Sequence, residues 1–151
     1  MNKLQEKIFE VVLKRQPARS VVMPDWEKTR NIAVLYSNNN ISNIMSQLSS
    51  SGKNVTLICP PDKKGICWLS ERPKKQIREQ LKTKQYDLLI DLTQESSLTM
   101  QYMAMYINAK FKTGRHTREG IYDLSIDTKA QETPDFLYEQ IVHYIKMFTK
   151  K

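Results

Sequence analysis

The sequence predicts an α/β protein with a Rossmann-like, doubly wound and mostly parallel sheet of four to five strands, and with additional N- and C-terminal helices. Three observations indicate this fold. Short apolar segments alternate along the chain with segments in which apolar residues recur at helical spacing. Residues 85–93 (QYDLLIDLT) have a continuous apolar centre closed by acids, which is typical of a strand buried on both faces of a parallel sheet. Turn residues such as Gly52 and Pro73 separate the segments.

Length and composition limit the class of protein. At 151 residues we expect a single α/β domain over residues 1–151, with residues 1–30 as an N-terminal helix and linker packed on it. A hydrophobic content of 40% with 26% charged residues is typical of a soluble protein. The apolar run 103–107 is too short to cross a membrane, and the charged N-terminus does not fit a signal peptide. We therefore expect a cytoplasmic protein in which Cys59 and Cys67 are reduced thiols.

The first half of the chain contains one βαβ unit. An amphipathic helix is predicted over residues 3–15. Residues 31–37 (NIAVLYS) are predicted to form a strand, residues 41–51 a helix, and residues 54–59 the next strand. Such a unit has a right-handed crossover in nearly all proteins. Residues 65–69 (GICWL) fit either a short strand or a buried loop.

The second half continues the alternation. A helix begins at Pro73, the central strand follows, and a Met- and Tyr-rich helix is predicted over residues 97–108. Residues 110–115 alternate between apolar side chains and lysines, which indicates a strand with one wet face near the sheet edge. Residues 121–127 predict a last strand, and Pro134 begins the final helix. The turn before the last strand is too short for a helical crossover, which favours an antiparallel direction for that strand.

Polar side chains follow the first and the central strand. In strand orders such as 2-1-3-4-5 these strands are neighbours, and open α/β sheets bind ligands in the crevice at their carboxyl ends. Helix N-termini at this crevice could donate to an anion, so the pocket would suit a small hydroxylated or phosphorylated ligand. The alternative is that Asn and Ser cap helices while Asp91 accepts hydrogen bonds from loop amides. The candidate ligand-binding residues are Ser37, Asn38, Asn40, Asp91, Thr93, Glu95 and Arg115.

The net charge of +8 is concentrated in part of the chain. Residues 53–86 contain nine Lys and Arg residues against three acids. This segment could attract phosphate-bearing partners, or it could be a solvated helix face; no nucleic-acid-binding motif accompanies it. The turn with Arg115, His116 and Arg118 could hold a phosphate, because guanidinium groups match its oxygens, or it could be a solvated basic turn.

Several classes of site lack the residues that they need. No segment resembles the G-x-G-x-x-G motif of dinucleotide binding, so no cofactor is expected. The asparagines at 38–40 provide no carboxylate for the Mg²⁺ site of a receiver domain. His116 and His143 have no nucleophile or carboxylate at a spacing that suggests a triad, and no metal site is indicated. We therefore assign no catalytic residue.

Two resemblances support this fold. The run YDLLIDL, a helix and then AKFKTGR resemble the N-terminal half of heptosyltransferase-like glycosyltransferases, which implies a Rossmann-like half-domain over roughly residues 31–115. Transferase activity is not implied, because residues 37–40 replace the glycine-containing loop and the chain has no room for the second domain. The runs YDLLIDL, QYMAMYINAKFKTGR, YDLSID and EQIVHYI are similar to an uncharacterised family of short α/β proteins found mainly in Bacteroidetes. That family implies a cytoplasmic location and no established activity.

Two functional hypotheses follow. We favour a non-catalytic binding or protein-interaction module, because no nucleophile–base pair is present and the helices 97–108 and 134–149 are broadly apolar. Such helices could contact a second copy of the chain or a partner protein. The alternative is a small enzyme or ligand-binding protein that acts on a phosphorylated or sugar metabolite at the crevice. Nucleic acid and membranes are not expected partners.

Overall fold

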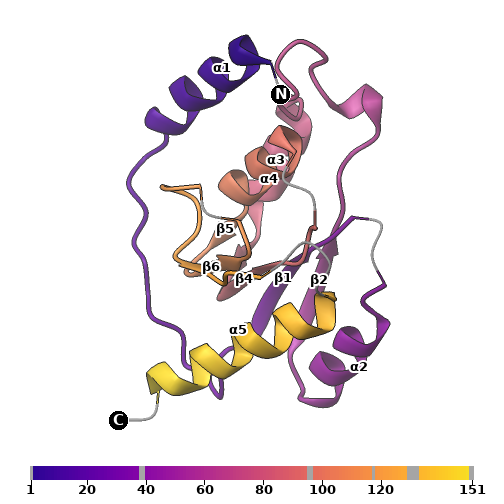
Figure 1. Cartoon of the computed structure of the whole chain (residues 1–151), viewed down its shortest axis with the longest axis vertical. Helices are drawn as coiled ribbons and strands as arrows, with labels where there is room; N and C mark the ends of the chain where they lie inside the picture. The colour runs from indigo at the N-terminus through magenta and orange to yellow at the C-terminus, as the bar shows by residue number, and fades with distance from the viewer. Residues whose placement is uncertain (1, 38–39, 95–96, 117, 129–132, 150–151) are drawn as a thin grey trace.

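The centre of the molecule is a five-stranded sheet. The computed structural model describes residues 2–37, 40–94, 97–116, 118–128 and 133–149. The strand order is β2-β1-β4-β6-β7, and every neighbouring pair is parallel (Figure 1). The predicted α/β fold is therefore confirmed, including the position of the central strand next to the first. The strands are β1 (Asn31–Leu35), β2 (Asn54–Ile58), β4 (Leu88–Asp91), β6 (Lys112–Gly114) and β7 (Leu124–Ser125).

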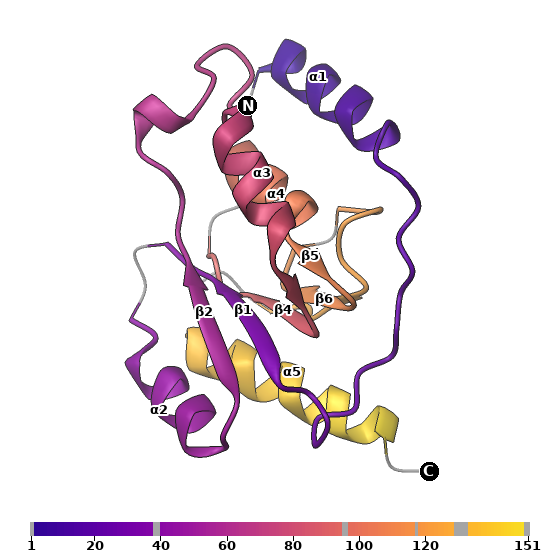
Figure 2. The ribbon, with the colours of Figure 1, turned by 180° about the vertical axis from the view of Figure 1, so that it is seen from behind.

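Helices cover both faces of the sheet (Figures 1 and 2). Along β4, Leu88 and Ile90 pack toward α2 and α5, whereas Leu89 packs toward α1 and α4. This alternation is expected of a strand that is buried on both faces. Among the described helices, none combines the length and the apolar character needed to span a bilayer. The helices are α1 (Lys3–Lys14), α2 (Ser42–Ser50), α3 (Lys75–Thr83), α4 (Leu98–Tyr106) and α5 (Pro134–Thr149).

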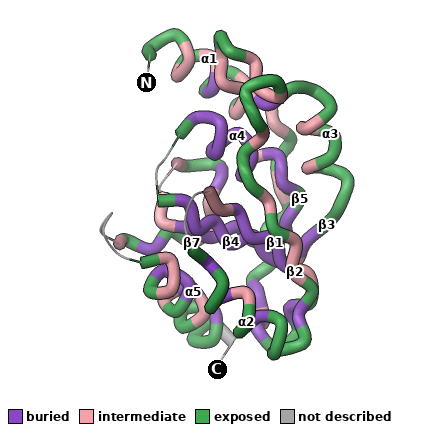
Figure 3. The backbone as a smooth tube through the Cα atoms, turned by 90° about the vertical axis from the view of Figure 1, so that its right-hand side faces the viewer, coloured by how far each residue is buried: buried purple, intermediate pink, exposed green. Residues whose placement is uncertain are grey.

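The helix α4 is enclosed by the rest of the chain (Figure 3). Eight of its nine residues are buried between the sheet, α1 and α3. Its Met and Tyr side chains therefore belong to the core. A helix that is apolar on several sides is either buried or covers a partner surface, and α4 is buried. The α4 helix does not offer an apolar face to a partner.

The predicted strand 85–93 is divided at Asp87. Before this residue, β3 (Gln85–Tyr86) pairs with β5 (Asn108–Ala109) in a separate two-stranded sheet. The Asp87 carboxylate accepts hydrogen bonds from the backbone N–H groups of Arg30 and Asn31, at 2.9 and 3.0 Å. Asp87 thus joins the start of β4 to the start of β1. Before Asp87 the chain pairs with β5, and after it the chain pairs with β1.

Two expectations about the last strands are wrong. The β6 strand lies next to the edge strand β7, but it has no wet face, because all three of its residues are buried and Lys112 is 1% exposed. The β7 strand is parallel to β6 rather than antiparallel. Since β6 and β7 have only three and two residues, the connection covers about 10 Å of strand length, which an extended chain spans without a helix.

The segment 65–69 also differs from its prediction. It follows a short 3₁₀ helix, η1 (Lys63–Gly65), and forms neither a strand nor a buried loop. A single antiparallel bridge joins Ile66 to Pro73, and Trp68 is 87% exposed.

Candidate functional site

The carboxyl ends of β1, β4 and β6 meet at Asp91. Leu35, Asp91 and Gly114 lie side by side in the sheet. Asp91 is fully buried, and its Oδ1 accepts hydrogen bonds from the backbone N (2.9 Å) and the Oγ1 (2.6 Å) of Thr93. Its Oδ2 accepts a hydrogen bond from the hydroxyl of Tyr122 at 2.5 Å. Both carboxylate oxygens are therefore engaged inside the protein.

The charge state of this cluster follows from its burial. Burial raises the pKa of Asp91, and the charge of His116 with the hydrogen bonds from Thr93 and Tyr122 only partly offsets this effect. Burial, followed by the neighbouring Asp91 charge, raises the pKa of Tyr122 well above its usual value. Tyr122 therefore keeps its proton and acts as the donor to Asp91.

His116 is a donor in the same cluster. Its Nε2 lies 3.0 Å from Thr93 Oγ1 and 3.1 Å from the carbonyl oxygen of Thr93. The Thr93 hydroxyl hydrogen is directed to Asp91, and a carbonyl oxygen can only accept, so we infer that Nε2 carries a hydrogen. This nitrogen cannot then remove a proton from Thr93. Asp91, Thr93 and His116 form a positioning network rather than a nucleophile–base pair.

The other predicted site residues are more dispersed. Asn40, one residue before the Ile41 N-cap of α2, is exposed, and its Oδ1 accepts from the backbone N (3.1 Å) and Oγ (2.9 Å) of Ser42. Ser37 and Arg115 are half-buried beyond the ends of β1 and β6. Asn38 and Glu95 lie outside the described residues. Within the predicted set, a side-chain hydrogen bond joins Thr93 to Asp91.

The space around Asp91 is filled by protein. A Cβ atom built on Gly114 would lie 3.1 Å from Asp91 Cβ and 3.2 Å from Tyr122 Cε1, so only glycine fits here without displacement. Among the residues that the structure describes, no group of three or more His, Cys, Asp or Glu side chains could hold a metal ion. The function of the crevice as a ligand site stays a prediction.

We expect Tyr122→Phe to lower the free energy of unfolding by about 1–3 kcal/mol, because Asp91 Oδ2 loses its donor inside the core. Urea unfolding would measure this change. Tyr144→Phe on α5 is the matched control, since Tyr144 is 38% exposed and its change should stay within about 0.5 kcal/mol. Equal effects of the two variants would show that the Tyr122 hydroxyl does not support Asp91.

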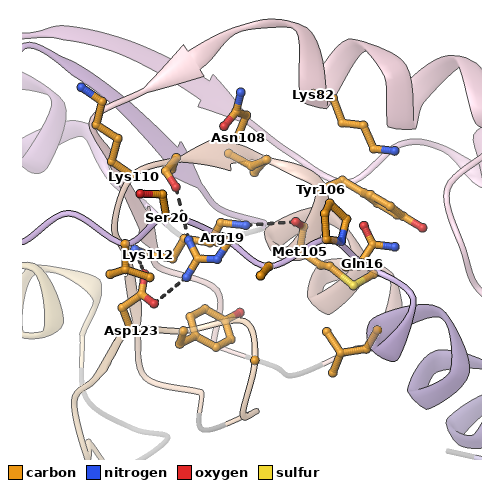
Figure 4. Close-up of a pocket in the computed structure, with 18 of the residues that line it drawn as sticks. Gln16, Arg19, Ser20, Lys82, Met105, Tyr106, Asn108, Lys110, Lys112 and Asp123 are labelled. Atoms are coloured by element: carbon orange, nitrogen blue, oxygen red, sulfur yellow. Dashed lines mark hydrogen bonds and ion pairs between the residues drawn. The ribbon is translucent and has the colours of Figure 1, made fainter.

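A cavity of about 800 Å³ lies near the amino ends of β3, β5 and β6, and Tyr122 is the member of the Asp91 cluster that lines it (Figure 4). Residues 16–21, here called the strap, form one wall as the chain passes from α1 toward β1. The end of α4 and the residues before β7 form other walls. Its charged lining residues are Arg19, Lys82, Lys110, Lys112 and Asp123.

Arg19 fixes the strap across this cavity. Its guanidinium donates hydrogen bonds to the carbonyl oxygens of Ala109 (3.2 Å) and Ile121 (3.4 Å). It also forms an ion pair with Asp123 Oδ1 at 2.5 Å, while Asp123 Oδ2 accepts from the backbone N of Lys112 at 2.8 Å (Figure 4). Asp123 thus links the strap directly to β6.

Lys112 reaches from β6 to the end of α4. Its Nζ donates to the carbonyl oxygens of Ala104 (2.7 Å) and Met105 (3.0 Å), where a helix C-terminus favours a cation. Burial lowers the pKa of Lys112 to about 7; the Arg19 charge acts in the same direction and Asp123 in the opposite one. An ammonium group has three N–H donors, so these two bonds leave one further position on the amine.

Sequence reasoning did not predict this cavity. The alternation of Lys110 and Lys112 indicates a solvated strand face, but Lys112 lies beside Leu89 on the face that α4 covers. No local pattern connects Arg19 with Asp123, which are 104 residues apart. Of the Lys and Arg residues in the basic segment 53–86, only Lys82 lines the cavity, so the charge excess in the sequence did not locate it.

Comparison with known proteins identifies a family. A family of unknown function (DUF6913) matches residues 62–148, which is more than half of the chain. The chain belongs to this family. The prediction of an uncharacterised family is thereby confirmed. No curated protein and no solved structure matches the chain.

The DUF6913 match covers only part of the candidate sites. Asp91, Thr93, His116 and Tyr122 lie inside the matched residues, as does Lys112. The strap lies outside them, so the cavity combines matched and unmatched parts of the chain.

Proposed function

We propose that this DUF6913 protein is a non-catalytic binding module that holds a small anionic ligand in the cavity under the strap. The observation that carries the proposal is the excess of basic groups in the cavity lining, which contains four basic side chains and one carboxylate. A cavity of about 800 Å³ has the size of a small-molecule site. A positively charged lining favours an anion.

The lining also indicates the body of the ligand. Leu13, Met105 and Ile107 provide apolar walls, whereas Gln16 and Asn108 provide neutral polar groups that can bind hydroxyls. A sugar-sized molecule that carries a phosphate or a carboxylate satisfies both features. The third N–H of the Lys112 ammonium form and the ammonium group of Lys82 would contact its anionic end.

The arrangement of the titratable side chains supports binding rather than catalysis. Asp91 and His116 do not line the cavity, and the described bonds of His116 Nε2 make it a donor to Thr93. Tyr122 does line the cavity, but its hydroxyl donates to Asp91. A small enzyme that acts on a phosphorylated or sugar metabolite is the second candidate, since an amine with a pKa of about 7 can exchange a proton near neutral pH.

Thermal unfolding with matched ligands tests the proposal. Inorganic phosphate, pyrophosphate and glucose 6-phosphate should raise the Tm at constant ionic strength, and glucose should not. A ligand at 100 times its Kd stabilises the folded state by about 2.7 kcal/mol, which corresponds to about 5–10 °C for a chain of this size. No shift with any anion would contradict an anion-binding cavity.

We expect Lys82→Gln to weaken phosphate binding about tenfold or more, because a charge-assisted hydrogen bond contributes about 1.5–3 kcal/mol. Isothermal titration calorimetry would measure the Kd. Lys75→Gln is the matched control: it removes the same charge from the same helix, but the Lys75 side chain is 78% exposed and does not line the cavity. Equal losses in both variants would indicate general attraction to a basic surface instead of binding in the cavity.

A further inference from the structure

An apolar tip projects from the segment between η1 and α3. Residues 66–73, here called the Trp68 loop, are closed by the bridge between Ile66 and Pro73. At its tip Trp68 is 87% exposed and Leu69 is 53% exposed. Neither side chain contributes to the two apolar clusters that form the core. The loop therefore leaves its largest apolar side chain in water.

Hydrogen bonds fix the backbone of the Trp68 loop. The backbone N of Cys67 donates to the carbonyl oxygen of Arg72 (2.8 Å), and the backbone N of Glu71 donates to the carbonyl oxygen of Cys67 (2.8 Å). Glu71 has a φ of 62°, in the left-handed region that few residues other than glycine adopt. The surrounding bonds stabilise this conformation, so the loop holds one shape.

The body of the protein also holds the Trp68 loop. Thr99 Oγ1 on α4 donates to the carbonyl oxygen of Glu71 at 2.8 Å. The Nε of Arg72 donates to the hydroxyl of Tyr106, also on α4, at 2.7 Å. The tip is consequently presented in a fixed position, which reduces the entropy that binding would cost.

A fixed, exposed tryptophan is typical of a recognition surface. Tryptophan contributes a large apolar area and one N–H donor, and it is enriched among the residues that dominate binding energy at protein interfaces. An isolated exposed leucine needs no explanation, but Trp68 and Leu69 are adjacent on a rigid loop. Together they form an anchor for a matching pocket.

The charges around the tip indicate its partner. Lysines at 63, 64, 74 and 75 flank the loop, and all four are exposed. Two copies of the chain would bring these lysines together on a protein with a net charge of +8, which opposes self-association through this surface. The half-buried Glu71 and the exposed Asp62 place two negative charges among these lysines, so the surface is not uniformly positive. A protein partner with separate carboxylates can avoid these two acids.

We propose that the Trp68 loop binds a partner protein that has an apolar pocket bordered by carboxylates. Trp68 and Leu69 enter the pocket, and the flanking lysines pair with its rim. This surface is distinct from the cavity under the strap, and the proposal does not depend on the ligand of that cavity.

Selection from a random 12-residue peptide library on the immobilised full chain tests the proposal. The enriched peptides should combine acidic and apolar residues, and synthetic copies should bind the wild-type chain in solution. Trp68→Ala should weaken this binding at least about tenfold, since a hot-spot tryptophan contributes about 2 kcal/mol or more. Met23→Ala is the control, because Met23 is also exposed, at 58%, but lies on the linker. An unchanged Tm would show that Trp68→Ala folds normally.

Any of the following results would overturn the proposal. Peptides without acidic residues, or peptides that bind Trp68→Ala as well as wild type, would exclude this surface as the anchor. Cosedimentation with vesicles of phosphatidylcholine and phosphatidylserine that requires Trp68 would identify a lipid surface instead. A concentration-dependent dimer in light scattering that Trp68→Ala abolishes would identify a second copy of the chain.

Discussion

Replacing Phe9 with alanine should lower the free energy of unfolding by about 3–5 kcal/mol. Phe9 is the buried residue of α1, and its ring centre lies 4.6 Å from that of Tyr102 on α4. The guanidinium of Arg118 lies 4.7 Å from the same ring centre. Alanine would leave a cavity between α1 and α4 that the fixed neighbours cannot fill. Urea unfolding at neutral pH would measure the loss.

A change on the exposed side of α1 provides the control for Phe9. Val11→Ala removes apolar atoms from the same helix, but Val11 is 47% exposed, so its effect should stay within about 0.5 kcal/mol. Similar losses for the two variants would show that α1 does not dock through Phe9. Because Leu13 at the end of α1 lines the cavity, Phe9→Ala should also weaken phosphate binding.

The wild-type chain should gain stability relative to Lys112→Met as the pH is raised from about 7 toward 10. Burial, assisted by the Arg19 charge, lowers the pKa of Lys112 to about 7, against 10.5 for the unfolded chain. Below pH 7 both states hold the proton. Between the two pKa values the unfolded chain binds more protons, so the free energy of unfolding rises with pH. The full gain is on the order of a few kcal/mol.

Urea unfolding of both proteins at several pH values between 6 and 10 would measure this difference. Lys112→Met has nearly the same length and no titrating group, so all other titrations cancel in the comparison. A stability difference that is constant over this range would show that Lys112 keeps its proton in the folded chain. A phosphate ligand in the cavity should shift the rise to higher pH, because an adjacent anion favours the ammonium form.

The central strands could be predicted from sequence because their apolar residues follow one another without interruption. Residues 32–35 and 88–90 are continuous apolar runs, which are typical of a strand covered on both faces. The two-residue spacing of Asp91 and Thr93 likewise placed them together, since Thr93 folds back on the carboxylate as in an Asx turn. Local sequence was sufficient wherever the contacts are local.

The remaining features depend on contacts that are distant in sequence. The sequence indicates a solvent-facing Lys112, whereas in the fold its amine reaches the end of α4. Tyr122 meets Asp91 only because the β6–β7 connection returns along the same face of the sheet. Arg19 meets Asp123 only because the strap crosses the body of the protein. No propensity or periodicity within one segment contains this information.

The parallel β6–β7 connection explains the existence of the cavity. The crossovers through α3 and α4 lie on one face, and a right-handed helical crossover from β6 to β7 would lie on that face beside α4. The described residues between β6 and β7 form no helix, and the strap passes there instead. A helix about 10 Å wide occupies about 120 Å³ per residue, so a cavity of about 800 Å³ equals about two helical turns. The cavity therefore occupies the side of the sheet on which a helical crossover from β6 to β7 would lie.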